Sequence, residues 1–444
     1  MQPAPQYYRK NLKTKATMIN KILLCALCLQ TLNAQAQIQK PQTPQAQEYR
    51  QVPVSESPTA KGAQPASRPP SAAPVSPPTV PNTRTRQPEV DDAMNDLRET
   101  APSVQYTFPS LEKVAGTEHY RAAFNDINNM LEGVTPLSIK RATFLTENAW
   151  YGNVKNYEYF NNDITAQTDI IREALRQAGY TDDNESAKKW ILHRFMSDTL
   201  RLKGANGKNR LTHLPYKYDF DDPYGKQSWS KMFVTKLMSD KKGQCHSLPL
   251  LYLILAEELD VPAWLAYSPQ HSYIKLKDKQ GTWYNLELTN GRYSSDAWVQ
   301  ASGYIKADAM RSKIYMDTLS KQQLIAATLM DLANGYHAKF GYDQFVLDCA
   351  EKTLQYYPNN IFALQMKANY YTMLFQRVHK QLNEPPATRI HEYPQAFALV
   401  KKYKTMYKIV DQMGYTEMPE AIYSKWLKSF NEEQMRQPKT VIRP

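Results

Sequence analysis

Cys245 is the residue of this chain whose surroundings most clearly favour chemistry. It closely follows Gly243 and precedes an apolar run at residues 247–259, in which leucines recur at helical spacing. Pro262 ends this run. The pattern predicts a helix with one buried face and Cys245 at its N-terminus. The helix dipole and the free N–H groups at such a position favour the thiolate, which is the nucleophilic form of cysteine.

A histidine and an acid follow Cys245 on segments that have the length and composition of strands. These strands are expected at 263–267, 272–276 and 283–288. A turn containing Lys, Asp and Gly joins the last two as a hairpin. His271 opens the second strand and Glu287 lies on the third. Cys245, His271 and Glu287 can therefore serve as the nucleophile, the base and the group that orients the base.

Three further residues with polar side chains lie near this set in the sequence. Asn285 shares a strand face with Glu287, because successive side chains alternate, so either residue could orient His271. Gln244 is a candidate for binding the oxyanion together with the Cys245 backbone N–H. His246 adjoins Cys245 but points away from it around the helix, which makes it a poor base.

The residues around Cys245 resemble a known group. The run Gly-Gln-Cys-His-Ser-Leu-Pro-Leu-Leu-Tyr, with the later His271 and Glu287-Leu-Thr-Asn-Gly, is similar to the transglutaminase-like superfamily of papain-type cysteine enzymes. The likeness spans roughly residues 190–360 and is greatest to bacterial members with appended tetratricopeptide-type (TPR-like) helices. It implies an α+β fold in which the helix carrying Cys245 packs on a small antiparallel sheet. It also implies Cys245 as nucleophile and His271 as base, although the family usually has Asp where Glu287 stands.

The first 105 residues predict a signal for export followed by a linker. Residues 1–36 predict a secretory signal, with Lys21 before a short apolar core and Ala34-Gln-Ala36 as the cleavage site. Translation starts at Met1 or Met18, and the mature, periplasmic or secreted chain is expected to begin at Gln37. Residues 37–105 are rich in Pro, Gln and Ser and predict a disordered linker.

Two structured parts are expected after the linker. The first, residues 106–318, is the transglutaminase-like domain, with helices expected at 119–131, 137–151, 164–178 and 185–202. Residues 203–226 are expected to form a loop that lines the substrate groove. The second part, residues 319–444, is a TPR-like helical module in which 332–360 resembles one repeat, followed by helices at 361–382, 395–413 and 417–431. A single repeat rarely folds alone, so the module should dock on the first domain.

Composition excludes several function classes. The net charge is +12, of which 5 falls in residues 1–36, and the remaining +7 is mixed with acidic residues, so nucleic-acid binding is not expected. No phosphate loop, dinucleotide fingerprint or zinc spacing occurs, so neither a cofactor nor a metal is implied. The acidic run at Asp219, Asp221 and Asp222 lacks the calcium-loop pattern and is interpreted as a solvated turn. Cys349 falls in a predicted helix and is interpreted as a core residue.

The sequence favours an exported cysteine enzyme that acts on amide bonds of a protein or peptide substrate. Hydrolysis is favoured, and transfer to an amine is the other outcome open to the same acyl-enzyme. The alternative is a catalytically inactive scaffold that binds a protein partner through the TPR-like helices.

Overall fold

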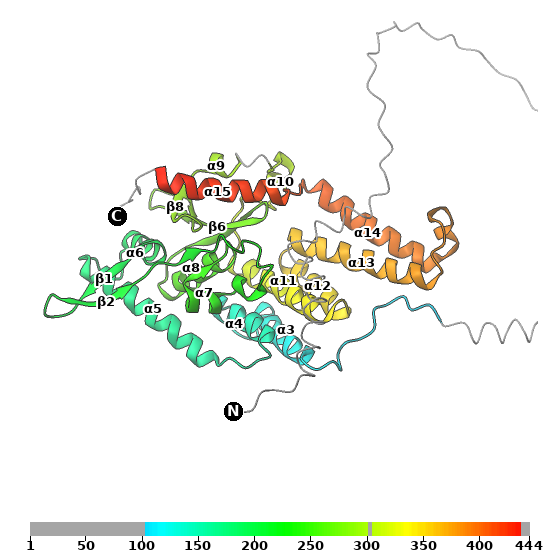
Figure 1. The fold of residues 1–444 in the computed structure, drawn as a ribbon, viewed down its shortest axis with the longest axis horizontal. Coiled ribbons are helices and arrows are strands. Elements are labelled where there is room, and N and C mark those ends of the chain that lie inside the picture. The colour runs from blue at the N-terminus through cyan, green and yellow to red at the C-terminus, as the bar shows by residue number, and fades with distance from the viewer. Residues whose placement is uncertain (1–102, 301–303, 437–444) are drawn as a thin grey trace, which may run out of the picture. The chain divides into compact units, whose positions relative to one another are not determined.

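The computed structural model describes residues 103–300 and 304–436; the predicted signal peptide and almost all of the predicted linker lie outside them. The described part is a mixed α+β fold, mostly helical, with small sheets and a C-terminal helical region (Figure 1). No helix among the described residues has the length and apolarity needed to cross a bilayer.

Among the described residues, four helices precede the first strand: α3 (Thr117–Leu131), α4 (Ile139–Trp150), α5 (Tyr157–Gln177) and α6 (Glu185–Ser197). Ser138, Asn156 and Asn184 accept hydrogen bonds from backbone N–H groups of α4, α5 and α6, which fixes where these helices begin. The Asn156 cap starts α5 earlier than the apolar pattern predicts. Helix α6 ends earlier than predicted, because residues 200–203 pair as a strand.

Residues 203–226 contain more regular structure than the loop that the sequence predicts there. Strands β1 (Leu200–Lys203) and β2 (Asn209–His213) form an antiparallel hairpin, and β3 (Lys217–Tyr218) pairs in parallel with β4 (Lys242–Gly243). Between β3 and β4 lie the 3-10 helix η3 (Trp229–Met232) and helix α7 (Val234–Asp240). The β3–β4 pair brings residues 217–218 beside the segment that leads to Cys245.

Helix α8 (Ser247–Glu258) lies at the centre of the fold. All residues from Ser247 to Ala256 are buried, so the helix is enclosed on every side rather than on the single face that was expected. The reason is its position between α4, α5, α6 and α7 on one side and the sheet on the other.

The main sheet is an antiparallel meander that follows α8 directly. Its strands are β5 (Trp264–Ser268), β6 (His271–Lys277), β7 (Trp283–Glu287) and β8 (Arg292–Ser294), hydrogen-bonded in that order. The first three lie within one residue of the predicted strands at each end. The register places Ser268 opposite His271 and Leu286 opposite Ile274, which sets the positions of the candidate site residues.

The chain then becomes helical again. Two short helices, α9 (Asp296–Gln300) and α10 (Ala307–Arg311), lead into two helical hairpins built from α11 (Lys321–Phe340), α12 (Gln344–Tyr356), α13 (Ile361–Gln381) and α14 (Pro394–Gln412), with the 3-10 helix η4 (Ala387–Glu392) before α14. Helix α11 packs on α3 and α4 as well as on α12. One continuous core therefore joins Tyr120 of α3 to Tyr336 of α11 and includes the buried Cys349.

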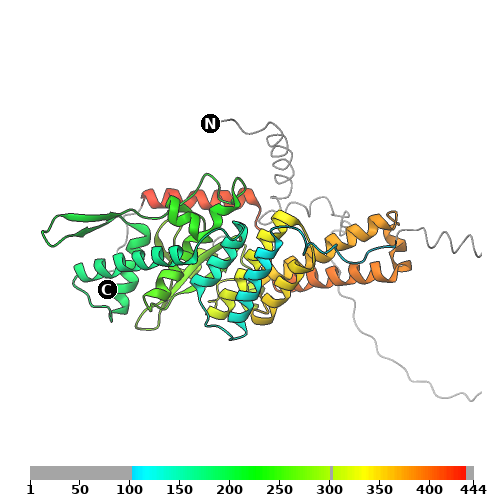
Figure 2. The ribbon, with the colours of Figure 1, turned by 90° about the horizontal axis from the view of Figure 1, so that it is seen from below.

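The last helix, α15 (Glu420–Arg436), does not extend the helical hairpins. Both ribbon views show it beside the part of the chain that carries the main sheet (Figures 1 and 2). The carbonyl of Glu420 accepts a hydrogen bond from the Tyr224 hydroxyl, and its carboxylate pairs with Lys226 at 2.8 Å. Trp426 stacks on Trp298, with ring centroids 5.7 Å apart.

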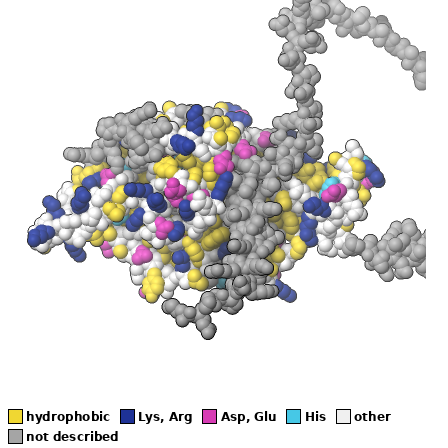
Figure 3. Space-filling view, viewed as in Figure 1, with side chains coloured by type: hydrophobic (Ala, Val, Ile, Leu, Met, Phe, Trp, Pro, Cys, Tyr) yellow, Lys and Arg dark blue, Asp and Glu magenta, His cyan; other side chains and the backbone are white. Residues whose placement is uncertain are grey.

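Basic and acidic side chains are interspersed over the face seen in Figure 3. The visible part of this face shows no continuous basic surface, in agreement with the mixed charge of the sequence.

A truncation after Ser320 is expected to aggregate, because it removes α11 from the shared core and exposes the apolar faces of α3 and α4. Size-exclusion chromatography of the truncated and full-length chains measures this. A truncation after Arg436 is the control, since it removes none of the described helices. A soluble, monomeric chain ending at Ser320 would show instead that residues 321–444 are an independent unit.

Candidate active site

Gly243 and Ser247 position Cys245 at the entrance to α8. A Cβ atom on Gly243 would lie 2.5 Å from the Ser247 hydroxyl and 2.9 Å from Leu237, so the close approach of these side chains requires glycine. The Ser247 hydroxyl accepts a hydrogen bond from the Gln244 N–H at 3.0 Å. Cys245 is 9% exposed and its carbonyl accepts a 2.5 Å hydrogen bond from the Ser272 hydroxyl, which ties it to β6.

The sheet register places Glu287 beside His271. The His271 Nε2 and Glu287 Oε2 atoms are 2.6 Å apart, and both side chains are buried. Extending the β6–β7 pairing by one residue puts Glu287 opposite Tyr273, two residues from His271 on the same face. The other carboxylate oxygen of Glu287 accepts the Thr289 N–H at 2.9 Å, which holds the acid in place.

Asn285 shares this face but lies two residues before Glu287 on β7, opposite Lys275. Two strand residues span roughly 7 Å, which separates the amide from His271. Its Nδ2 donates to Asp296 at 2.9 Å. The structure thus pairs Glu287, rather than Asn285, with His271.

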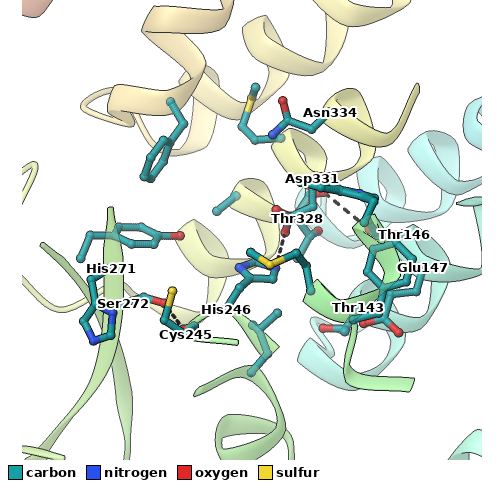
Figure 4. A pocket seen from close by; sticks show the side chains of 18 of the residues that line it. Thr143, Thr146, Glu147, Cys245, His246, His271, Ser272, Thr328, Asp331 and Asn334 are labelled. Carbon is teal, nitrogen blue, oxygen red and sulfur yellow. Dashed lines mark hydrogen bonds and ion pairs between the residues drawn. The ribbon is translucent and has the colours of Figure 1, made fainter. Parts of the chain in front are cut away.

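The surroundings of Cys245 favour its thiolate. Burial by itself would raise the pKa of the Cys245 thiol, but hydrogen bonding to His271 and the charge of that ring outweigh burial, so the pKa lies below the usual value. Burial would lower the pKa of His271, yet the Glu287 charge and the hydrogen bond to Cys245 raise it to about 10. The two side chains lie side by side at one edge of the cavity described below (Figure 4).

Gln244 does not face the thiol. It is fully buried, and its Nε2 donates to the carbonyl oxygens of Asp219 at 3.2 Å and Asp222 at 2.6 Å. Its amide therefore holds the 219–222 turn and is not placed to bind an oxyanion.

Asp219 and Asp222 are themselves buried, which corrects the interpretation of this acidic run as a solvated turn. Asp219 pairs with Lys231 at 3.0 Å, and Asp222 accepts hydrogen bonds from the backbone N–H groups of residues 226–228.

Two aromatic residues of α15, neither of them expected from the sequence, cover the Cys245–His271 pair. The Tyr423 hydroxyl donates to the Cys245 Sγ at 3.6 Å, and the Trp426 ring meets the His271 ring edge-on at 5.0 Å. The Gln270 side chain also donates to the Met418 carbonyl just before α15. Their spacing on a predicted helix indicates a shared face, but nothing local indicates what that face covers.

A cavity of about 140 Å³ opens beside Cys245 on the side of the helical hairpins (Figure 4). Its walls come from α4, η3, α8, β5, β6, α11 and α13. Residues 203–226 do not line it, in contrast to the expectation that this segment forms a groove wall.

His246 lines the cavity, with its Nε2 atom 3.3 Å from a carboxylate oxygen of Asp331 on α11. Burial by itself would lower the pKa of His246, but the Asp331 charge outweighs burial and raises this pKa to about 9.

Comparisons with protein-family models, curated proteins and solved structures found no match to this chain. Among the described residues, no group of His, Cys, Asp and Glu is arranged to hold a metal ion. The arrangement of side chains itself is therefore the basis for the functional proposal.

Replacing Tyr423 by Phe is expected to raise the pKa of the Cys245 thiol, because the Tyr423 hydroxyl donates a hydrogen bond that stabilises the thiolate. The pH dependence of alkylation of Cys245 by iodoacetamide measures this, and its midpoint should move to higher pH. Tyr415→Phe is the control, since that ring packs in a separate core cluster. An unchanged midpoint for Tyr423→Phe would mean that the Tyr423 hydroxyl does not stabilise the Cys245 thiolate.

Proposed function

We propose that this protein is a cysteine enzyme with a transglutaminase-like core and a TPR-like module, which cleaves amide bonds through an acyl-enzyme. The observation that carries the proposal is the buried chain of contacts from Cys245 through His271 to Glu287, with 2.6 Å between the imidazole and the carboxylate. A thiol, an imidazole and an acid in this order form the nucleophile, base and orienting group of an acyl-transfer site.

The proposed reaction has two steps. The Cys245 thiolate attacks the amide carbonyl, and the His271 imidazolium gives its proton to the leaving amine as the C–N bond breaks, leaving a thioester on Cys245. Neutral His271 then takes a proton from water, whose oxygen attacks the thioester, and the acid and the free thiolate are released. An amine in place of water would give a new amide; we favour water as acceptor. Glu287 orients the ring and stabilises its charged form throughout.

The test is to trap the acyl-enzyme. Incubation of the full chain with a library of peptide esters, followed by proteolysis and mass spectrometry, should reveal acyl adducts on Cys245. Cys349 is the internal control, because it is fully buried and burial raises its thiol pKa. Adducts on both cysteines alike, or on neither, would contradict the proposal.

The cover formed by α15 favours a second candidate, a transglutaminase-like scaffold without catalysis that binds a partner protein through its helices. Tyr423 and Trp426 occupy space next to the thiol and the imidazole that a substrate would otherwise approach. The rate at which Cys245 is alkylated near neutral pH distinguishes the two candidates, because the thiol of an active site should react fast and the thiol of an inactive site should not.

A further inference from the structure

The cavity beside Cys245 holds features that the acyl-transfer step does not require. Cys245 and His271 form one edge of it, and side chains from distant segments form the rest (Figure 4). A substrate amide at the thiol would place its neighbouring side chain next to this space.

The surface that the cavity presents is mostly apolar. Large apolar side chains line it from η3, α8, α11, α13 and the residue between η3 and α7: Trp229, Met232, Phe233, Leu250, Met330 and Phe362. Apolar pockets of this kind bind apolar groups by removing both surfaces from water.

The ionisable groups Glu147 and His246 in the cavity already have partners. Glu147 accepts the backbone N–H groups of Val234 at 2.6 Å and Thr235 at 2.9 Å, at the start of α7. His246 is paired with Asp331. A charged substrate group would have to break one of these pairs or remain unpaired in a largely apolar site, and both are costly.

The size of the cavity limits what it can hold. Its volume of about 140 Å³ is close to that of an engineered apolar cavity of roughly 150 Å³ that binds benzene. It therefore matches one aromatic ring or one branched aliphatic side chain.

We propose that this cavity is a specificity subsite for an aromatic or branched aliphatic side chain next to the amide bond that is cleaved. The subsite rests on the proposed function for its place in the reaction, but its preference for apolar side chains can be measured without turnover. Phe362 of α13 forms part of its wall, so the helical region takes a direct part in substrate selection.

Binding to the full-chain Cys245→Ser variant tests the subsite independently of catalysis. Ligand-observed NMR would compare N-acetyl amides of Phe, Leu, Ala, Lys and Glu. The Phe and Leu amides should bind about tenfold or more tighter than the Ala amide, as expected for filling an apolar pocket, and the Lys and Glu amides should bind no better than the Ala amide. Equal affinities, a preference for a charged side chain, or no binding by any of them would overturn the proposal.

Phe362→Ala and Met373→Ala are a matched pair of variants for this test. Both residues lie on α13 and both are 39% exposed, but only Phe362 lines the cavity. In the Cys245→Ser background, Phe362→Ala should weaken binding of the Phe amide and Met373→Ala should not. Equal loss in both would overturn the assignment of the site.

The two proposals fail in distinguishable ways. Selective binding of apolar amides without any acyl adduct on Cys245 would contradict the enzyme and leave the subsite standing. Adducts on Cys245 that form regardless of the neighbouring side chain would contradict the subsite and leave the enzyme standing.

Discussion

The Cys245→Ser variant is expected to lose turnover of amide substrates by about 10⁶-fold, which is the order of loss when the nucleophile of a catalytic triad is removed. A serine hydroxyl is far less acidic than a thiol, so the interactions that lower the pKa of Cys245 will not yield an alkoxide. Thermal melting should change little, because the swap is nearly isosteric and the new hydroxyl lies beside His271 and Tyr423. Steady-state turnover and circular dichroism measure the two effects.

Cys349→Ser is the matched control for this experiment. Cys349 is fully buried in the core and lies on α12. A hydroxyl there should lower the melting temperature while turnover remains, because the site does not use this thiol. Residual turnover of Cys245→Ser near the level of Cys349→Ser would exclude Cys245 as the nucleophile.

The Glu287→Gln variant is expected to lower turnover by roughly a thousandfold or more, as neutralising the acid of a triad does. The amide keeps the shape of the side chain but removes the charge that raises the pKa of His271. The pKa of His271 should then fall. Because the imidazolium stabilises the thiolate, the pKa of Cys245 should rise, and the midpoint of its alkylation profile should move to higher pH.

Asn285→Ala is the control for Glu287→Gln, because its amide bonds to Asp296 and not to His271. It should leave turnover near the wild-type level. A reversed ranking would make Asn285 the orienting residue. Near-wild-type rates for both variants would mean that His271 needs neither side chain.

Local patterns in the sequence predicted the elements that carry the candidate site. Gly243 before an apolar run predicts a tight turn into a helix, and the structure places Cys245 at the entrance to α8. Short runs of strand composition predicted β5, β6 and β7 to within a residue at each end. These predictions succeed because turns, helices and strands depend on neighbouring residues, whose preferences the sequence displays directly.

The choice between Glu287 and Asn285 needed the register of β6 against β7. Alternation along the strand puts both side chains on the face of His271 but does not say which of them lies beside it. The pairing of Leu286 with Ile274 places Glu287 closer to His271 than Asn285. The burial of Gln244 likewise depends on the 219–222 turn folding over it.

The tertiary structure alone decided what surrounds the thiol. Tyr423 lies 178 residues after Cys245, and Phe362 of the cavity wall lies 117 residues after it. The apolar and aromatic patterns of α11, α13 and α15 predict helices with buried faces, but a face that must be buried does not specify its partner. The hydrophobic effect favours burial of an apolar face against any apolar partner, whatever its place in the sequence. Only the packing of the complete chain therefore brings these helices to Cys245 and His271.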